Sequence, residues 1–213
     1  MRNTKKSLAD LKSKMQLRQS GQKIVIASHN EGKVDEIRVL LSFTGLDVLS
    51  AKELSLPEPV EDGKTFIANA EIKAKTCAEK SGLLSLADDS GLVVPALGGA
   101  PGIYSARWAG PQKDFYAAMT LLENKLQPSD NRHAYFVCAL SLAQPDGTCY
   151  TYEGEVHGQL VWPPRGELGF GYDPIFEPEG YDQTFGEINP ELKHEISHRA
   201  AAFGLLTDAH FGR

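Results

Sequence analysis

Cysteine is scarce in this chain and follows no pattern. Three cysteines, Cys77, Cys138 and Cys149, occur in 213 residues, and they lie far apart in the sequence. Disulfide frameworks and structural zinc sites need an even set of cysteines or close CxxC spacing. The sequence therefore indicates reduced thiols and argues against a cysteine-based metal centre.

An excess of basic residues is also absent. Asp and Glu total 28 against 22 Lys and Arg, which gives a formal net charge of −6. A protein that binds nucleic acid through a broad basic face needs the opposite balance. We therefore expect no nucleic-acid partner, although a small anionic ligand needs only a few lysines and a divalent cation.

Long apolar runs are missing as well. No stretch approaches the length of a transmembrane helix, and residues 1–22 are basic and polar, without the apolar core of a secretory signal. We expect residues 1–22 to form a disordered extension and residues 23–213 to form a single domain. No membrane association and a cytoplasmic location are the matching expectations.

Strands and helices alternate through the first half of the sequence. Buried strands are predicted at residues 23–28 and 46–51, and amphipathic helices at 31–42 and 66–81. A long antiparallel hairpin is predicted at 133–158, because two β-rich arms flank a Gln-Pro-Asp-Gly turn. This order predicts an α/β fold with a mixed, twisted sheet, and the chain length allows two lobes around a central substrate cleft.

The remaining segments complete this secondary-structure prediction. Residues 83–97, LLSLADDSGLVVPAL, are typical of a strand, a tight acidic turn and a second strand. An amphipathic helix is predicted at 114–126. A single final helix is predicted from about Pro190 to His210, with proline acceptable in its first turn.

A polar turn, SHNEGK, joins the first strand to the first helix. The free backbone N–H groups of a helix start favour phosphate, and Lys33 adds a positive charge. The turn is not a Walker A loop, since it lacks the two-glycine frame and the Lys-Ser/Thr pair. A capped turn with a surface lysine is the alternative interpretation. The candidate ligand contacts are Ser28, His29, Asn30, Glu31, Gly32 and Lys33.

Paired acids at Asp88 and Asp89 are the clearest candidates for chemistry. Successive strand residues point to opposite faces, so we expect one carboxylate to enter a pocket and the other to bind the backbone of the turn. The first can bind magnesium or take a proton from water. Glu58 and Glu61, in a proline-broken loop, could complete a magnesium site. A simple acidic turn and solvated loop charges are the alternatives.

Two late segments could hold a base or another planar, oxygen-rich group. In GFGYDPIF, Phe170 or Tyr172 could stack on a base while Asp173 forms a hydrogen bond. In KHEISHRAAAF, cations gather at a helix start, which is unusual unless an anion lies nearby. Hydrogen bonding by His198 and Arg199 is favoured over a zinc pair, since no HExxH motif or third ligand is evident.

Six segments occur in a specific order: SHNEGK, TFIANAEIKA, LADDSGL, GAPGIYSARWAG, GFGYDPIF and KHEISHRAAAF. Together they closely resemble the inosine/xanthosine triphosphate pyrophosphatase (Ham1-like) family, from about residue 23 to the C-terminus. The resemblance implies magnesium-dependent hydrolysis of ITP, dITP and XTP to the monophosphate and pyrophosphate. It also implies a homodimer that removes these nucleotides from the nucleotide pool.

The resemblance further implies a role for each site residue. Asp89 would be the catalytic acid and a metal ligand, with Glu58 or Glu61 as the second ligand. His29 departs from the pattern, because many members have glycine there. The substrate contacts it implies are Ser28, Asn30, Lys33, Ser90, Phe170, Gly171, Tyr172, Asp173, Lys193, His198 and Arg199.

The hydrogen bonding that base selection needs agrees with the roles that the resemblance implies. Donors from Arg199 and nearby backbone N–H groups would face the 6-oxygen of hypoxanthine or xanthine. The amino group of adenine would leave each donor unpaired, at about 1–3 kcal/mol. The enzyme alternatives are a related pyrophosphatase with another preferred base and a phosphohydrolase that releases orthophosphate. A nucleotide-binding module without catalysis is the alternative from another class, but it does not need paired acids beside an acidic loop.

Overall fold

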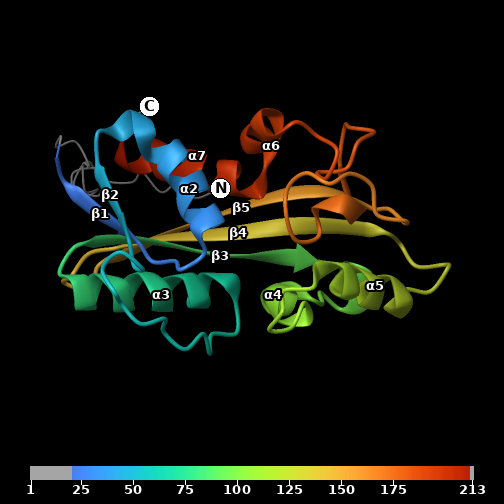
Figure 1. The fold of residues 1–213 in the computed structure, drawn as a ribbon, viewed down its shortest axis with the longest axis horizontal. Coiled ribbons are helices and arrows are strands. Elements are labelled where there is room, and N and C mark those ends of the chain that lie inside the picture. Colours follow the sequence, from blue (N-terminus) through green and yellow to red (C-terminus); the bar gives the residue numbers. More distant parts are fainter. Residues whose placement is uncertain (1–20, 212–213) are drawn as a thin grey trace, which may run out of the picture.

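The computed structural model describes residues 21–211. Of the extension predicted at residues 1–22, residues 1–20 therefore lie outside the described residues. A six-stranded mixed sheet in the order β2-β1-β3-β4-β5-β6 forms the centre of the molecule. Helices cover both of its faces: α3, α4 and α5 lie on one side and α2, α6 and α7 on the other (Figure 1). The predicted α/β fold with a mixed sheet is confirmed.

The sheet changes from parallel to antiparallel pairing at β3. β1 pairs in parallel with β2 and β3, and every later neighbour pairs antiparallel. The long β4–β5 hairpin confirms the predicted one. The strands are β1 (Lys23–Ile26), β2 (Asp47–Ser50), β3 (Leu84–Val93), β4 (His133–Ala143), β5 (Cys149–Leu160) and β6 (Phe176–Pro178).

Helix boundaries follow local capping chemistry. Thr65 Oγ1 accepts a hydrogen bond from Ala68 N at 3.1 Å, and Gly82 ends the same helix with φ 67°. The helices are α2 (Glu31–Leu41), α3 (Phe66–Ser81), α4 (Ser105–Trp108), α5 (Phe115–Lys125), α6 (Pro190–Ile196) and α7 (His198–His210). Short 3₁₀ turns cover Ser42–Thr44, Pro95–Leu97, Gly102–Tyr104 and Asp173–Ile175.

The predicted acidic turn at Asp88 and Asp89 is wrong. β3 runs through both residues as one strand, with Asp88 opposite Leu140 and Asp89 opposite Ala139 on β4. The unbroken ladder to β4 satisfies the backbone, and cationic side chains on each face of the sheet hold the two carboxylates. Tertiary partners therefore override the turn preference of Asp and Gly.

The single C-terminal helix is also wrong, because the chain breaks into α6 and α7 at Ser197. Ser197 has ψ 158°, and its Oγ accepts a hydrogen bond from Ala200 N at 3.2 Å. This serine is therefore an N-cap that starts a new helix in a new direction. The break places His198 and Arg199 in the first turn of α7.

β1 is much shorter than β3, and this difference opens the molecule. Residues 24–26 of β1 pair with residues 84–86 of β3, and β1 then ends. From Ala87 onward β3 is paired only with β4, up to an isolated bridge between Val93 and Pro101. In sheets with parallel strands, ligands bind beyond the carboxyl ends of the strands, which is where this gap lies.

Two main clusters of buried side chains flank this gap. One packs β1 and β3 against α2 and α7, and includes Ile24, Leu86 and Phe203. The other surrounds Phe136 and Phe176. These clusters correspond to the two lobes that the sequence predicted around a cleft.

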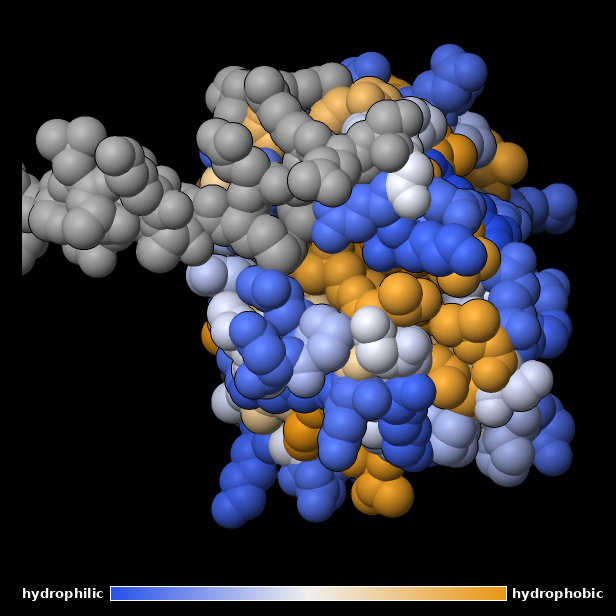
Figure 2. Space-filling model, turned by 90° about the vertical axis from the view of Figure 1, so that its left-hand side faces the viewer, coloured by the Kyte–Doolittle hydropathy of each residue, from blue (hydrophilic) through white to orange (hydrophobic). Residues whose placement is uncertain are grey.

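The surface mixes apolar and hydrophilic side chains, as folded domains generally do. On the end of the molecule that lies left in Figure 1, apolar surface gathers at the centre and hydrophilic side chains border it (Figure 2). Within residues 21–211, no helix combines the length and the hydropathy needed to cross a bilayer.

Candidate active site

A cavity of about 540 Å³ occupies the gap beyond β1. The turn between β1 and α2 and the loop after β2 line one end, and residues 170–173 with the start of α7 line the other. Most residues predicted for the site meet here: Ser28, His29, Asn30, Lys33, Glu58, Glu61, Ser90, Phe170, Gly171, Tyr172, Asp173, Lys193, His198 and Arg199. Segments far apart in the sequence thus form one cleft.

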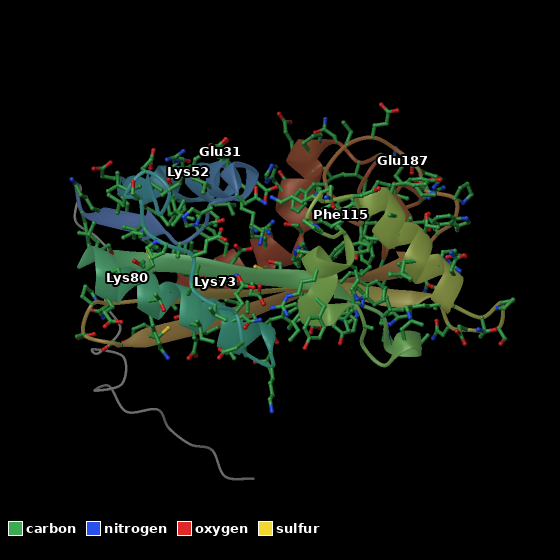
Figure 3. All side chains as sticks on the ribbon, turned by 60° about the horizontal axis from the view of Figure 1, so that its bottom comes forward. Glu31, Lys52, Lys73, Lys80, Phe115 and Glu187 are labelled. Carbon is green, nitrogen blue, oxygen red and sulfur yellow. The ribbon has the colours of Figure 1, made fainter. Side chains whose placement is uncertain are left out.

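Three predicted residues do not line this cavity. Glu31 pairs with Lys52 on the outer side of α2, where the two side chains lie close together (Figure 3). Gly32 lies in the first turn of α2. Asp89 points to the opposite face of β3, toward Lys73 of α3, which does line the cavity.

The SHNEGK turn is built around the N-terminus of α2. Asn30 caps the helix through a hydrogen bond from Lys33 N to its Oδ1 at 3.4 Å, and Ser28 Oγ accepts from Asn30 N at 3.1 Å. These bonds leave the first N–H groups of α2 free to bind an anion. The turn therefore has the form that the phosphate hypothesis requires.

Lys33 does not extend freely into the cavity, because Asp88 holds it. Asp88 Oδ2 accepts hydrogen bonds from Lys33 Nζ at 3.0 Å, Ser90 Oγ at 2.8 Å and Arg199 Nη2 at 3.2 Å. Arg199 also donates to Glu36 Oε2 at 2.7 Å. The expectation that one of the two aspartates would bind the backbone of a turn is wrong. Asp88 lines the cavity and joins three side chains from three different elements, and Asp89 accepts from Asn69 and Lys73.

The electrostatics of Asp88 follow from this network. Burial alone would raise the pKa of Asp88, but the charges of Lys33, Arg199 and Lys73 outweigh burial and hold that pKa well below its usual range. Asp88 is therefore a permanent carboxylate. Its charge keeps two cations, one from each end of the cavity, in fixed positions.

Asp89 has the opposite environment on the other face of β3. Burial and the nearby charge of Glu61 raise the pKa of Asp89, although Lys73 counteracts them. Lys73 Nζ lies 3.1 Å from Asp89 Oδ1 and 2.9 Å from Glu61 Oε1. A carboxylate with a raised pKa beside a cleft is suited to accept a proton.

The structure separates the two loop glutamates. Glu61 meets Asp89 through Lys73, whereas Glu58 pairs with His29 Nδ1 at 3.1 Å and its side chain is 71% exposed. Within the described residues, no group of three or more His, Cys, Asp or Glu side chains could hold a metal ion. Among the described residues beside the cavity, Asp89 and Glu61 are two carboxylates that meet, through Lys73, and they are the candidates to hold a divalent cation.

This pair fits a magnesium ion chemically. Magnesium in phosphate-transfer sites is usually held by one or two carboxylates and by the phosphates of the substrate. A positive charge, Lys73 Nζ, already lies between the two carboxylates. The buried Oδ1 of Asn69, whose amide nitrogen donates to Asp89 at 3.2 Å, has no hydrogen-bond partner.

The other end of the cavity presents an aromatic ring beside a cation. Phe170 is 47% exposed, and Lys193 Nζ lies 4.9 Å from the centre of its ring. Asp173 Oδ2 accepts from Lys193 Nζ at 2.5 Å and from Phe170 N at 2.6 Å, which fixes the pair. Tyr172, by contrast, is buried and donates its hydroxyl to Ser105 O at 3.0 Å. Phe170 is therefore the ring available for stacking.

His198 forms the inner wall of this end. Its ring stacks on Phe136 with centroids 5.1 Å apart, and its buried Nδ1 has no hydrogen-bond partner. Burial, with the charges of Arg199 and Lys193, lowers the pKa of His198 well below its usual value. His198 is therefore a neutral imidazole that can donate at one nitrogen and accept at the other.

Two residues of this site, Lys73 and Asn69, were not predicted from the sequence, and Asp88 was predicted with other partners. Lys73 and Asn69 lie four positions apart on α3, on the side where Ala70 and Ala74 are buried. Polar residues within an apolar helix face were the available signal. The role of Asp88 had no signal, because its partners come from α2 and α7. Figure 3 shows Lys73 on α3 and Phe115 on α5, both of which line the cavity.

A cavity with a capped helix start at one end, an exposed ring beside a lysine at the other and an acid pair reached through Lys73 is typical of hydrolases that act on nucleotides. The model of the Ham1 family matches residues 24–209, and the chain belongs to this family. It is 57% identical over 190 residues to the dITP/XTP pyrophosphatase of Zymomonas mobilis, covering 88% of this chain and 91% of that one. A dITP/XTP pyrophosphatase of Caulobacter vibrioides is 54% identical over 193 residues, with 90% and 99% covered.

Solved structures agree with this family. The structure of the Staphylococcus aureus Ham1 protein is similar to this fold with a TM-score of 0.80 and 40% identity, covering 87% of this chain and 96% of that one. A HAM1 protein from Coxiella burnetii gives a TM-score of 0.79 and 36% identity, with the same coverage.

Proposed function

We propose that this protein hydrolyses dITP, ITP and XTP to the nucleoside monophosphate and pyrophosphate. The observation that carries the proposal is one continuous cavity, with the SHNEGK turn, Glu61 and Lys73 at one end and an exposed ring beside a fixed cation at the other. Lys73 links this cavity to Asp89 on the opposite face of β3. The names of the bacterial relatives support the substrate class. The enzyme is then a hydrolase that removes abnormal purine nucleotides from the pool.

The chain itself supplies the proton acceptor. Asp89, whose pKa is raised by burial and by Glu61, takes the proton of the attacking water. Lys73 stays protonated, because Asp89, Asp88 and Glu61 raise its pKa against the effect of burial. Lys73 and Lys33 therefore offset the negative charge of the phosphates, and the free N–H groups of α2 orient them.

A divalent cation completes this end of the site. Glu61 and Asp89 would hold it, and Mg²⁺ bound there supplies positive charge to the phosphate oxygens. The buried Asn69 Oδ1, which has no hydrogen-bond partner, supports a cation beside these acids.

Base recognition belongs to the other end. Phe170 stacks on the purine, and Lys193 with the neutral His198 offers hydrogen bonds to its edge. Arg199 donates from one terminal nitrogen to Glu36 and from the other to Asp88. We therefore infer that it affects the base chiefly through its positive charge and through the side chains that it holds in place. Ser90, Gly171, Tyr172 and Asp173 complete the substrate contacts that we infer.

Assembly and location remain expectations for this chain. We expect a homodimer, as the resemblance implies, and a cytoplasmic location. Light scattering of the purified protein at several concentrations tests the dimer, and a mass of 23.2 kDa at all of them would contradict it.

The function is tested by product analysis with dITP. We expect stoichiometric dIMP and pyrophosphate in the presence of Mg²⁺, and none after chelation with EDTA. Release of orthophosphate would indicate a different phosphohydrolase, and dITP binding without turnover would indicate a binding module. Either result would overturn the proposal.

A further inference from the structure

The loop that carries Glu61 is fastened to the rest of the molecule by side chains. Residues 57–64, here called the strap, form no helix or strand, and none of the described backbone–backbone hydrogen bonds involves them. The strap runs along the phosphate end of the cavity, which Pro57, Glu58, Pro59 and Glu61 line. Because Glu61 must meet Asp89, the fastening of this segment bears directly on the acid pair.

Three attachments hold the downstream half of the strap. Arg107 Nη2 donates to the backbone oxygen of Glu61 at 3.0 Å, and Lys73 pairs with its carboxylate at 2.9 Å. Gly63 packs tightly on α3: a Cβ there would lie 2.5 Å from Asn69 Oδ1 and 2.9 Å from Ala68 Cβ. The upstream half has none of these contacts.

His29 fastens the upstream half. Its Nε2 lies 2.8 Å from the backbone oxygen of Leu56, directly before the strap, and its Nδ1 lies 3.1 Å from Glu58 Oε1. Both partners are acceptors, so both ring nitrogens must donate for both bonds to form. Glu58 is mostly exposed and such surface pairs contribute little, so the bond to Leu56 O is the stronger attachment.

We propose that His29 is a positioning residue: it holds the strap in place, and the strap in turn holds Glu61 close to Asp89. The proposal rests on the proposed function for the role of Glu61, but the contact itself does not. A glycine at this position could form neither side-chain bond. With histidine at this position the SHNEGK turn has less backbone freedom than it would have with glycine. In exchange, the turn is linked directly to the strap.

Two conservative variants separate the two bonds of His29. The amide nitrogen of Gln reaches about as far as Nε2 of histidine, so His29→Gln keeps a donor for Leu56 O. That of Asn corresponds to Nδ1, so His29→Asn keeps a donor only toward Glu58. The matched control is His194→Ala, which removes an exposed imidazole of α6 with no bond among the described residues.

The decisive readout is trypsin cleavage after Lys64, measured by mass spectrometry without nucleotide. We expect His29→Asn to be cut about 2- to 10-fold faster than the wild type, the factor that one hydrogen bond contributes. His29→Gln and His194→Ala should match the wild type. Equal cleavage of all four proteins, or equal acceleration by Gln and Asn, would overturn the proposal.

A second readout connects the strap to the cation. With dITP as substrate, His29→Asn should raise the Mg²⁺ concentration for half-maximal turnover by about 2- to 10-fold relative to His29→Gln. An unchanged Mg²⁺ requirement would contradict the link to Glu61. If the wild type failed to turn over dITP, the proposed function would fail, whereas the cleavage experiment would still test the strap.

Discussion

Two adjacent carboxylates have opposite properties because a strand alternates its faces. Asp88 faces Lys33 and Arg199, which hold its pKa low against burial, whereas Asp89 faces Glu61 and a single lysine, and its pKa is raised. One residue step along β3 thus separates a carboxylate held ionised by cations from the carboxylate that we propose as the proton acceptor. This division of roles is the main chemical feature of the site.

Asp89→Asn should abolish pyrophosphate release, with turnover reduced by at least about 100-fold, the lower range for loss of a general base. Asparagine keeps the shape of the side chain, and Lys73 still pairs with Glu61, so folding should survive. Steady-state turnover and thermal unfolding are the measurements. Substantial retained activity in a folded variant would contradict the role of Asp89.

Asp88 should make the free energy of unfolding depend on pH in the acidic range. Its folded pKa lies below its unfolded value, so its stabilisation is present above about pH 4 and is lost as the pH falls. Asp88→Asn breaks a buried pair, at about 3–5 kcal/mol near neutral pH. Urea unfolding at pH 7 and pH 3 should show a smaller difference for this variant than for the wild type. Equal differences would exclude the effect.

Lys33→Ala should weaken triphosphate binding, since the lysine stands at the phosphate turn. Its partner Asp88 keeps the bonds from Arg199 and Ser90, so the chain should still fold. We expect KM for dITP to rise, measured by pyrophosphate release. An unchanged KM and kcat would return SHNEGK to the interpretation of a capped turn.

Among the elements, those with strong local signals were predicted and those set by tertiary partners were not. The β4–β5 hairpin has β-rich arms and a Pro-Asp-Gly turn, and α3 has Thr65 and Gly82 at its ends. The sequence predicts a turn at Asp88 within what is one strand, β3, because the cationic partners of Asp88 come from distant helices. It predicts one C-terminal helix in place of α6 and α7, because the sequence does not indicate whether a serine caps a helix or lies inside one.

The close contact between β5 and α7 gives a prediction for the base end. A Cβ at Gly154 would lie 2.3 Å from Ala202 N and 2.5 Å from His198 O, both backbone atoms. Gly154→Ala should therefore displace α7, lower stability by about 1–3 kcal/mol and raise KM for dITP. Denaturant unfolding and steady-state kinetics are the measurements.

Gly204→Ala is the matched control on the same helix. A Cβ there has nothing within 4 Å, so the variant should gain about 0.5–1 kcal/mol from helix propensity and keep the wild-type KM. If Gly154→Ala were as active and as stable as this control, α7 would not depend on that contact.

At the scale of the whole molecule, the sequence indicated which segments meet at the cavity but not how their side chains connect. Motif order indicated Ser28, Asp89, Phe170 and His198, and the cavity brings their segments together. The link from Lys33 through Asp88 to Arg199 joins the phosphate end to the base end, and it depends on the relative placement of α2, β3 and α7. Spacing in the sequence does not contain that placement.

We propose that one cleft recognises the base at one end and hydrolyses the triphosphate at the other. The most direct test compares kcat/KM for pyrophosphate release from dITP and XTP with that from dATP and dGTP at saturating Mg²⁺. A site with donors facing the 6-oxygen predicts that dITP exceeds dATP by at least about 100-fold. Equal values for dITP and dATP would contradict the account.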